Sequence, residues 1–381
     1  MAELGPAHPS GASPSETQDD WCANLSCYMA LTDAEKTAIG SVCFLAGPAT
    51  FLENALVLGA IAASRRLRRR PSYLFIGSLA LADVFASCFF TISFLDFHLL
   101  RRRDGRDAYL FKLGGVTLAF TSSLGSLLLT AIDRYVCIHH APRYKAVLTR
   151  RRALGGLAAL WSVSVLVSFL PLMGWTCPTG LTPPCSRLLP YIHNQYLACW
   201  TGFILTLLGL ILVAYGLVLW RAHQHEASMA RLGGGAGGHA RMRMDIRLAR
   251  TLGLILLILA VCWLPVLSFM LADVSHRLTR THQRVFTFCS MLCLVNSAVN
   301  PLLYALRCQE LRQALQRALG RWRGRCGRCR GRGGEGREAP GAPSLSNTEA
   351  NTGSSPGSED EPLGGSLSEA VDKQQLAVFR K

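Results

Sequence analysis

SLGSLLLTAIDRYVCIHH, residues 123–140, combines a membrane-like segment with a pair of charges. Its first ten residues carry no charge, and an acid and a base then stand side by side, Asp133 and Arg134. A charge inside a membrane segment is costly unless it is paired or reaches water. The stretch therefore predicts a spanning helix that ends on an ion pair, and it raises the question of what that pair does.

The composition of the whole chain also indicates a membrane protein. The chain has 381 residues, of which 50% are hydrophobic and only 17% are charged, whereas soluble proteins have about 25% charged residues. Crossing a bilayer takes about 20 apolar residues. We predict an all-α membrane protein, a seven-transmembrane helix bundle, from seven such runs: residues 37–63, 73–97, 109–138, 153–175, 192–219, 250–272 and 285–306.

The basic residues predict the orientation of this bundle. SRRLRRRP at 64–71 holds five arginines, and residues 307–337 hold ten. Residues 1–36, in contrast, hold one lysine. Because cytoplasmic loops carry an excess of Lys and Arg, we expect the N-terminus outside and the C-terminus inside, although RRRDGRD at 101–107 departs from this pattern.

These boundaries divide the chain into four parts. Residues 1–36 form an extracellular N-terminus, whose TDAE (32–35) has the capping-box pattern that starts a helix. Residues 37–306 form the bundle, with a flexible Gly-rich linker at 231–240. The third part, 307–323, is an amphipathic cytoplasmic eighth helix on anionic lipid, and the fourth, 324–381, is a disordered cytoplasmic tail. The apolar face of the eighth helix consists of Leu311, Leu315, Ala318, Leu319 and Trp322.

Three modifications follow from this topology. Asn24 begins a glycosylation sequon, Asn-Leu-Ser. Cys326 and Cys329 follow the amphipathic helix. The sequence is equally consistent with palmitoylation of these cysteines and with unmodified, reduced thiols. Ser354, Ser355 and Ser358 lie beside acidic residues, where phosphorylation would add further negative charge.

Nucleic-acid binding and catalysis are both disfavoured. The net charge is +16 and the pI about 9.6, but the arginines fall in short clusters between apolar runs, so we expect no nucleic-acid partner. No HExxH, GxSxG or GxxxxGK[ST] motif occurs, and GRGGEG at 331–336 neither follows a strand nor opens a helix. We therefore expect no enzyme.

Polar residues and prolines within the spans are functional candidates, because intramembrane polarity is costly. Asp83, Ser123, Asn296 and Ser297 offer one carboxylate with hydroxyls and an amide. This set suits a sodium ion and equally suits hydrogen bonds between helices. We expect no other metal or cofactor.

The prolines at positions 171, 265 and 301 predict helix kinks.

Several motifs together resemble the rhodopsin-like (class A) G-protein-coupled receptors. They are DRY (133–135) in the third span, CWLP (262–265) in the sixth, NPLLY (300–304) in the seventh, and LALAD (79–83), Asn54 and Trp161. The resemblance implies that Asp133 neutralises Arg134 at rest and that Asp245 holds Arg134 across helices. Breaking these contacts would open a cavity for a G-protein helix. The implied coupling and switch residues are Asp133, Arg134, Tyr135, Tyr215, Asp245, Trp263, Asn300, Pro301 and Tyr304.

The resemblance also locates a ligand site. Where amine receptors of the family carry an aspartate, this chain has Val116, so an amine ligand is not expected. The outer spans are instead aromatic, which suits a long apolar ligand, although an aromatic belt at the membrane interface explains Phe97 and Tyr196 equally well. Phe288 belongs to the same aromatic set. The implied ligand-binding residues are Phe90, Phe94, His98, Val116, Thr117, Phe120, Trp200, Trp263, Phe286 and Ser290.

Longer matches resemble the cannabinoid receptor subfamily. They include FKLGGVT (111–117), LPLMGWTC (170–177) and RMDIRLA (243–249), and the short N-terminus and WRAHQH (220–225) resemble its type 2 branch. The third span lacks the family's outer cysteine, and Cys177 and Cys185 lie close enough to bond within the 4–5 loop of an oxidised compartment.

The subfamily implies a plasma-membrane receptor for endocannabinoid lipids, 2-arachidonoylglycerol and anandamide. It would couple to inhibitory heterotrimeric G proteins and lower adenylate cyclase activity. Leu189 stands where an aromatic contact is expected. Two alternatives stay open: a receptor for another lipid mediator of the lysophospholipid type, and a seven-span transporter.

Overall fold

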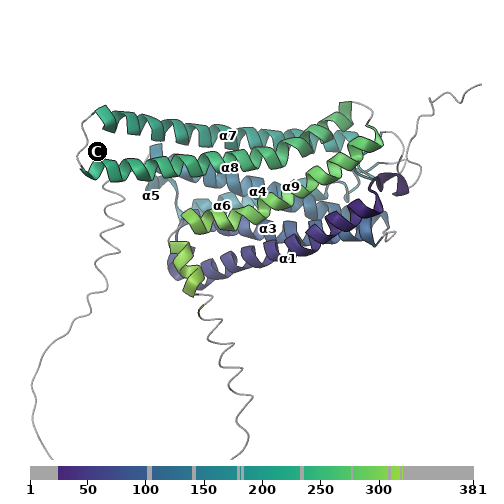
Figure 1. Ribbon diagram of the computed structural model, residues 1–381, viewed down its shortest axis with the longest axis horizontal. Helices are drawn as coiled ribbons and strands as arrows, with labels where there is room; N and C mark the ends of the chain where they lie inside the picture. The colour runs from purple at the N-terminus through teal and green to yellow at the C-terminus, as the bar shows by residue number, and fades with distance from the viewer. Residues whose placement is uncertain are drawn as a thin grey trace, which may run out of the picture.

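The computed structural model describes residues 25–100, 105–139, 143–177, 181, 184–231, 236–275, 278–307, 310–317 and 320. Seven long helices in this part of the chain are apolar enough to cross a membrane. They lie side by side along the long axis of the molecule (Figure 1). They are α1 (Asp33–Ala63), α3 (Pro71–Phe94), α4 (Arg106–His139), α6 (Arg150–Phe169), α7 (Asn194–Arg231), α8 (Ala236–Ser275) and α9 (Arg280–Arg307).

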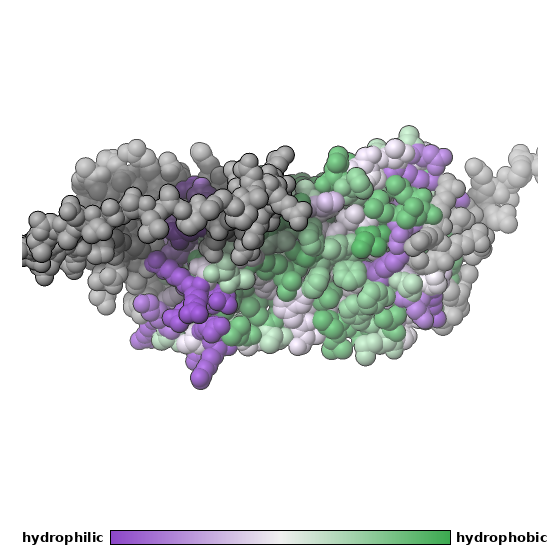
Figure 2. Space-filling model, turned by 90° about the horizontal axis from the view of Figure 1, so that it is seen from below, coloured by the Kyte–Doolittle hydropathy of each residue, from purple (hydrophilic) through white to green (hydrophobic). Residues whose placement is uncertain are grey.

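Shorter elements lie at the ends of the bundle. η1 (Leu25–Tyr28) and the α6–α7 connection lie at one end, which we call the pocket end. α2 (Arg65–Arg68) and α5 (Tyr144–Val147) lie at the other, which we call the arginine end. Figure 2 shows a broad hydrophobic band between hydrophilic groups at the two ends. The surface of the bundle is therefore that of a protein which crosses a membrane several times.

The start of α1 has the predicted cap. Thr32 N donates to Glu35 Oε2 at 2.8 Å, and Glu35 N donates to Thr32 Oγ1 at 3.4 Å. This reciprocal pair is a capping box, and it satisfies two backbone donors that the first turn leaves unpaired. The predicted helix start is confirmed.

The predicted end of the fourth span is wrong. α6 ends at Phe169, not at residue 175, so Pro171 follows the helix instead of kinking it. Proline has no N–H to donate to the carbonyl of Val167, and the hydroxyl of Tyr196 donates to that carbonyl instead, at 3.1 Å. Pro265 and Pro301 do lie inside helices.

Several further segments differ from the sequence prediction. α7 and α8 extend well beyond the apolar runs 192–219 and 250–272, because hydropathy measures the membrane-facing part of a helix and not its full length. Residues 236–240 of the predicted flexible linker are helical.

α3 continues into a π-helical turn, η2 (Leu95–Leu99), in which Leu100 N donates to Leu95 O at 2.9 Å.

The eighth helix is described over residues 310–317. Leu311 is fully buried against α1 and α3, so it faces the protein and not lipid. Glu310 accepts hydrogen bonds from Arg70 Nη1 at 2.9 Å and from Tyr73 Oη at 3.1 Å. Arg312 and Arg317 are exposed on the other face. The rest of the predicted range 307–323 lies mostly outside the described residues.

α4 lies at the centre of the bundle, where small residues allow close packing. A Cβ added at Gly114 would lie 2.7 Å from Phe169 Cδ1, and one added at Gly115 would overlap the ring of Phe89. These two glycines bring α4 against α6 and α3. The same helix carries Phe120 toward one end and Asp133 toward the other, so α4 connects the apolar cavity to the charged cluster described next.

Candidate ligand pocket and switch

A cavity of about 180 Å³ lies at the pocket end, among α3, α4, α7, α8, α9 and the α6–α7 connection. All ten ligand residues expected from the sequence line it: Phe90, Phe94, His98, Val116, Thr117, Phe120, Trp200, Trp263, Phe286 and Ser290. Phe97 and Tyr196 line the cavity as well. Phe288 is 41% exposed and is not among the lining residues.

Aromatic rings form most of one wall and the floor. Phe120 lies between Phe90 and Trp263, with ring centroids 6.1 Å and 5.2 Å away. Phe94 stacks on Phe90 and also contacts His98, with centroids 6.2 Å and 4.5 Å away. Offset and edge-to-face pairs of this kind stabilise a preformed apolar surface.

Few polar atoms in the cavity remain available to a ligand. The hydroxyls of Thr117 and Ser290 donate to carbonyls of their own helices. Lys112 forms an ion pair with Asp96. Five polar side-chain atoms of lining residues, in contrast, are buried without a hydrogen-bond partner: Ser93 Oγ, His98 Nδ1, Ser168 Oγ, Trp263 Nε1 and Gln283 Oε1. The cavity is thus an apolar site with a small number of polar contacts, as in many pockets for lipophilic ligands.

The roof of the cavity comes from segments that the motifs did not reveal. Leu188, Leu189 and Ile192 of the α6–α7 connection line the cavity, together with Tyr28 of η1. A disulfide joins Cys177 and Cys185 within that connection, with Cα atoms 5.6 Å apart. The aliphatic Leu189 therefore lies on the roof at the position where an aromatic contact was expected.

A polar cluster lies below the pocket around Asp83, which is fully buried in α3. Its oxygens accept hydrogen bonds from Ser123 Oγ at 3.1 Å and Asn300 Nδ2 at 2.8 Å. Ser297 faces the same carboxylate, and its hydroxyl has no partner in hydrogen-bond geometry. Asn296 is buried on the same helix. One carboxylate and two hydroxyls fit a small hard cation and also fit helix–helix hydrogen bonding.

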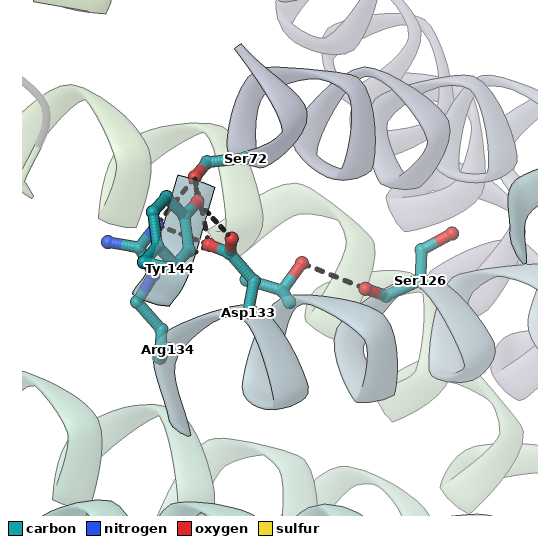
Figure 3. A network of polar contacts seen from close by, with 6 residues as sticks. Ser72, Ser126, Asp133, Arg134 and Tyr144 are labelled. Atoms are coloured by element: carbon teal, nitrogen blue, oxygen red, sulfur yellow. Dashed lines mark hydrogen bonds and ion pairs between the residues drawn. The ribbon is translucent and has the colours of Figure 1, made fainter. Parts of the chain in front are cut away.

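The charge pair of the opening stretch lies at the arginine end, where Figure 3 shows Ser72, Tyr144 and Arg134 converging on Asp133. Asp133 is fully buried. Its Oδ2 accepts from Ser72 Oγ at 2.8 Å and from Arg134 Nε at 2.9 Å, and its Oδ1 accepts from Tyr144 Oη at 2.7 Å. Arg134 also donates to Ser72 at 2.6 Å. The aspartate therefore has donors from three elements.

Tyr144 is a neutral donor in this cluster. Burial and the nearby Asp133 carboxylate raise the pKa of Tyr144 to about 12, so its hydroxyl keeps its proton at neutral pH. Sequence motifs did not indicate Tyr144 or Ser72, because nothing local in α5 or α3 marks them as partners of the third helix.

The remaining switch residues are described only in part. Tyr215 is buried in the core, Tyr135 is half-buried, and Asn300 and Pro301 lie in α9. The side chains of Asp245 and Tyr304 lie outside the described residues, as do Asn24, Cys326 and Cys329.

Known proteins agree with this architecture. The family model described as "7 transmembrane receptor (rhodopsin family)" matches residues 53–304. Human cannabinoid receptor 2 is 50% identical over 324 residues, 85% of this chain and 88% of the relative. Rat cannabinoid receptor 2 is 49% identical over 334 residues, 87% and 91% of the two chains. Xenopus laevis cannabinoid receptor 1 is 45% identical over 305 residues, 76% and 65%.

The residues that the family model matches run from within α1 into α9 and include the Asp133–Arg134 pair. With seven spanning helices, the chain is a multi-pass protein of the plasma membrane. It belongs to the rhodopsin family of seven-transmembrane receptors and, within that family, to the cannabinoid receptors.

Proposed function

We propose that this receptor binds the endocannabinoid lipids 2-arachidonoylglycerol and anandamide in the cavity at the pocket end. Ligand binding activates inhibitory heterotrimeric G proteins at the arginine end and thereby lowers adenylate cyclase activity. The observation that carries the proposal is the chemistry of the cavity: aromatic and aliphatic side chains line it, and its described lining includes no carboxylate. An amine ligand would have no counter-ion there.

A lysophospholipid is a poorer fit. Its phosphate would need a cluster of cationic side chains, and the one Lys or Arg in the described lining, Lys112, is already paired with Asp96. His98 and Trp263 instead offer single polar atoms, which suit the hydroxyl and carbonyl groups of a neutral acyl lipid. Membership in a receptor family argues against the transporter alternative. We also propose that the chain itself has no catalytic activity.

The orientation with the N-terminus outside is part of this proposal. The disulfide Cys177–Cys185 lies at the pocket end, and disulfides form in oxidising compartments. The arginines of α2 and of the start of α6 lie at the opposite end, where anionic cytoplasmic lipid attracts them. The division of the chain at residues 36, 306 and 323 stays a prediction.

The switch at the arginine end would work through Asp133 and Arg134. Arg134 contacts the carboxylate directly, which suits a resting state; Ser72 bonds to both members of the pair, and Tyr144 shares the carboxylate with Arg134. We expect Arg134 to leave Asp133 when α8 swings outward around Pro265 and a G-protein helix enters. Asp245 would hold Arg134 at rest, and Tyr215 and Tyr304 would line the opened cavity.

Further partners and modifications belong to the same proposal. Sodium would bind at Asp83, Ser123, Asn296 and Ser297 and stabilise the resting receptor. Receptor kinases and arrestins would act on the tail, Asn24 would be glycosylated, and Cys326 or Cys329 would be palmitoylated.

A titration of nucleotide exchange tests the proposed function. Membranes that contain the full chain and an inhibitory G protein are titrated with 2-arachidonoylglycerol while GTPγS binding is measured. Phe120→Ala removes a ring from the pocket wall, and we expect the potency to fall by at least about tenfold, equivalent to about 1.4 kcal/mol. The matched control is Phe288→Ala, which removes the same ring from an exposed position on α9. A folded, surface-displayed receptor that gives no stimulation would exclude the proposal.

A further inference from the structure

A buried carboxylate at the pocket end holds the roof of the cavity. Asp273 is 6% exposed and lies in the last turn of α8. Its two oxygens accept hydrogen bonds from Ser186 Oγ, from Arg187 N at 3.1 Å and from Leu188 N at 3.3 Å. A negative charge at a helix C-terminus is repelled by the helix dipole. The carboxylate is therefore stabilised by the loop that it binds, and not by its own helix.

Ser186 extends this contact across the roof. Its hydroxyl accepts from Leu188 N at 3.1 Å and from Leu189 N at 3.0 Å. Its carbonyl accepts from Tyr28 Oη at 3.0 Å. Through one serine, Asp273 thus orients the two leucines that line the cavity and the tyrosine of η1 that closes its edge.

α9 contributes to the same cluster through the next loop residue. Arg187 Nη1 donates to Leu278 O at 3.1 Å, and Gln283 Nε2 donates to Arg187 O at 2.7 Å. Gln283 also lines the cavity. The loop is therefore attached to the ends of both α8 and α9, at the level of the cavity roof.

This attachment is noncovalent. The disulfide Cys177–Cys185 closes a ring within the loop, and the outer part of α4, residues 106–120, contains no cysteine that could join the loop to the bundle. α8 also carries Trp263 at the cavity floor. A ligand in the cavity therefore lies between the floor, which includes Trp263 of α8, and the roof, which is bonded to Asp273 of α8.

We propose that Asp273 is a positioning residue that fastens the cavity roof to the outer end of α8, so that the roof and this end of the helix move together. A bound lipid leaves through the pocket end only when the Asp273–Ser186 cluster opens. The inference rests on the proposed function in one respect, because it takes this cavity as the ligand site.

The first test measures how fast ligand leaves the full-length receptor in membranes. Asp273→Asn keeps the shape of the side chain but replaces one accepting oxygen by an NH₂ group. That group cannot accept the hydrogen bonds that the loop donates to Asp273. We expect radiolabelled anandamide to dissociate about tenfold faster and, because ligand enters by the same opening, to associate at least as fast as with wild type, with an unchanged melting temperature. Ser186→Ala should give the same change through the loop side of the contact. Dissociation at the wild-type rate from both variants would overturn the inference.

The matched control is Glu35→Gln. Glu35 pairs with Arg284 at the same end of the bundle but not with the roof, and glutamine preserves the capping box. We expect wild-type dissociation from this variant. An equal acceleration in Glu35→Gln would mean that any lost carboxylate loosens this end, and the specific role of Asp273 would be wrong.

A second measurement needs no ligand and keeps the two proposals separable. Hydrogen–deuterium exchange of the segment 184–192 should rise in Asp273→Asn, because one of the two oxygens that accept from Ser186, Arg187 and Leu188 is replaced by an NH₂ group, while exchange in α4 stays unchanged. If wild-type receptor fails to bind anandamide but this local rise occurs, the proposed ligand is wrong and the fastening of the roof stands. If exchange in the segment does not change, the fastening is wrong whatever the ligand.

Discussion

The rings of Phe120 and Trp263 meet edge to face, with centroids 5.2 Å apart and planes at 85°. This contact joins α4 to α8 at the cavity floor, two residues before Pro265 in α8. A ligand that displaces either ring therefore acts on the helix that we expect to move. The contact lies far from the Asp133–Arg134 pair along the same α4.

We expect Phe120→Leu to raise nucleotide exchange without ligand by about two- to tenfold, because an edge-to-face pair contributes about 0.5–1.5 kcal/mol beyond its buried area. GTPγS binding in the absence of agonist measures the effect. Phe111→Leu is the control on the same helix, since Phe111 contacts Phe89 and Phe169 away from the cavity. Equal basal exchange in Phe120→Leu and wild type would contradict a holding role for the ring pair.

Two substitutions at the arginine end should act in opposite directions. Tyr144→Phe removes the donor to Asp133 Oδ1, so the carboxylate depends more on Arg134 and basal exchange should fall. Asp133→Asn removes the charge that holds Arg134, so basal exchange should rise several-fold. Changes of the same sign in both variants would show that the Asp133–Arg134 pair does not hold the resting state.

The effect of Tyr144 should not depend on pH between about 6 and 9. Its pKa is raised to about 12, so the folded protein retains the phenolic proton more strongly than the unfolded chain does. The hydrogen bond therefore contributes fully below the ordinary tyrosine pKa of about 10 and is lost only as the pH rises through about 12. The ratio of basal exchange in wild type and Tyr144→Phe, measured at several pH values, tests this; a ratio that changes near pH 7 would contradict it.

Sodium should weaken agonist binding in wild type and have no effect in Asp83→Asn. The carboxylate is the one charged ligand in the proposed site, and an amide oxygen binds a sodium ion far more weakly. Agonist competition in NaCl and in KCl of equal concentration separates sodium from ionic strength. The same sodium effect in the variant, or none in wild type, would leave Asp83 with a hydrogen-bonding role alone.

Removal of the loop disulfide should destabilise the receptor and speed ligand release. Closing a short ring of this kind restricts the unfolded chain and contributes about 2–4 kcal/mol, and both sulfurs lie in buried residues. We expect a lower melting temperature and faster dissociation for Cys177→Ser with Cys185→Ser. A double variant with wild-type stability and dissociation would show that hydrogen bonds alone hold the roof.

The helices and the pocket walls could be predicted because both depend on local patterns. Apolar runs marked all seven spans, and the family resemblance implied that Phe120 and Trp263 contact the ligand. The roof could not be predicted, since Tyr28 meets Ser186 across 158 positions of sequence and Asp273 carries no motif. The end of α6 was misplaced because hydropathy continues past Phe169, whereas Pro171 has no N–H for the helical ladder and the chain continues in turns to Trp175.

Of the four residues that meet around Asp133, the sequence predicted only the central pair. Asp133 and Arg134 are adjacent in a recognisable motif, but Ser72 and Tyr144 reach them from other elements. The buried face of the eighth helix illustrates the same limit: spacing indicated an apolar side at Leu311, but not that α1 and α3 would cover it.

The π-helical turn Leu95–Leu99 makes the geometry of the pocket sensitive to chain length. Its i to i+5 bond accommodates about one residue more than an α-helical turn. Deleting a single residue there would remove the residue that the wide turn accommodates, and the segment would close to regular α-helical winding. The contacts of His98 with Phe94 and of Asp96 with Lys112 are made from within the wide turn, so both would change with no loss of helix or of hydrophobicity. In a deletion scan of this receptor, the five positions 95–99 should therefore stand out as a register-setting segment, in which chain length carries as much information as side-chain identity.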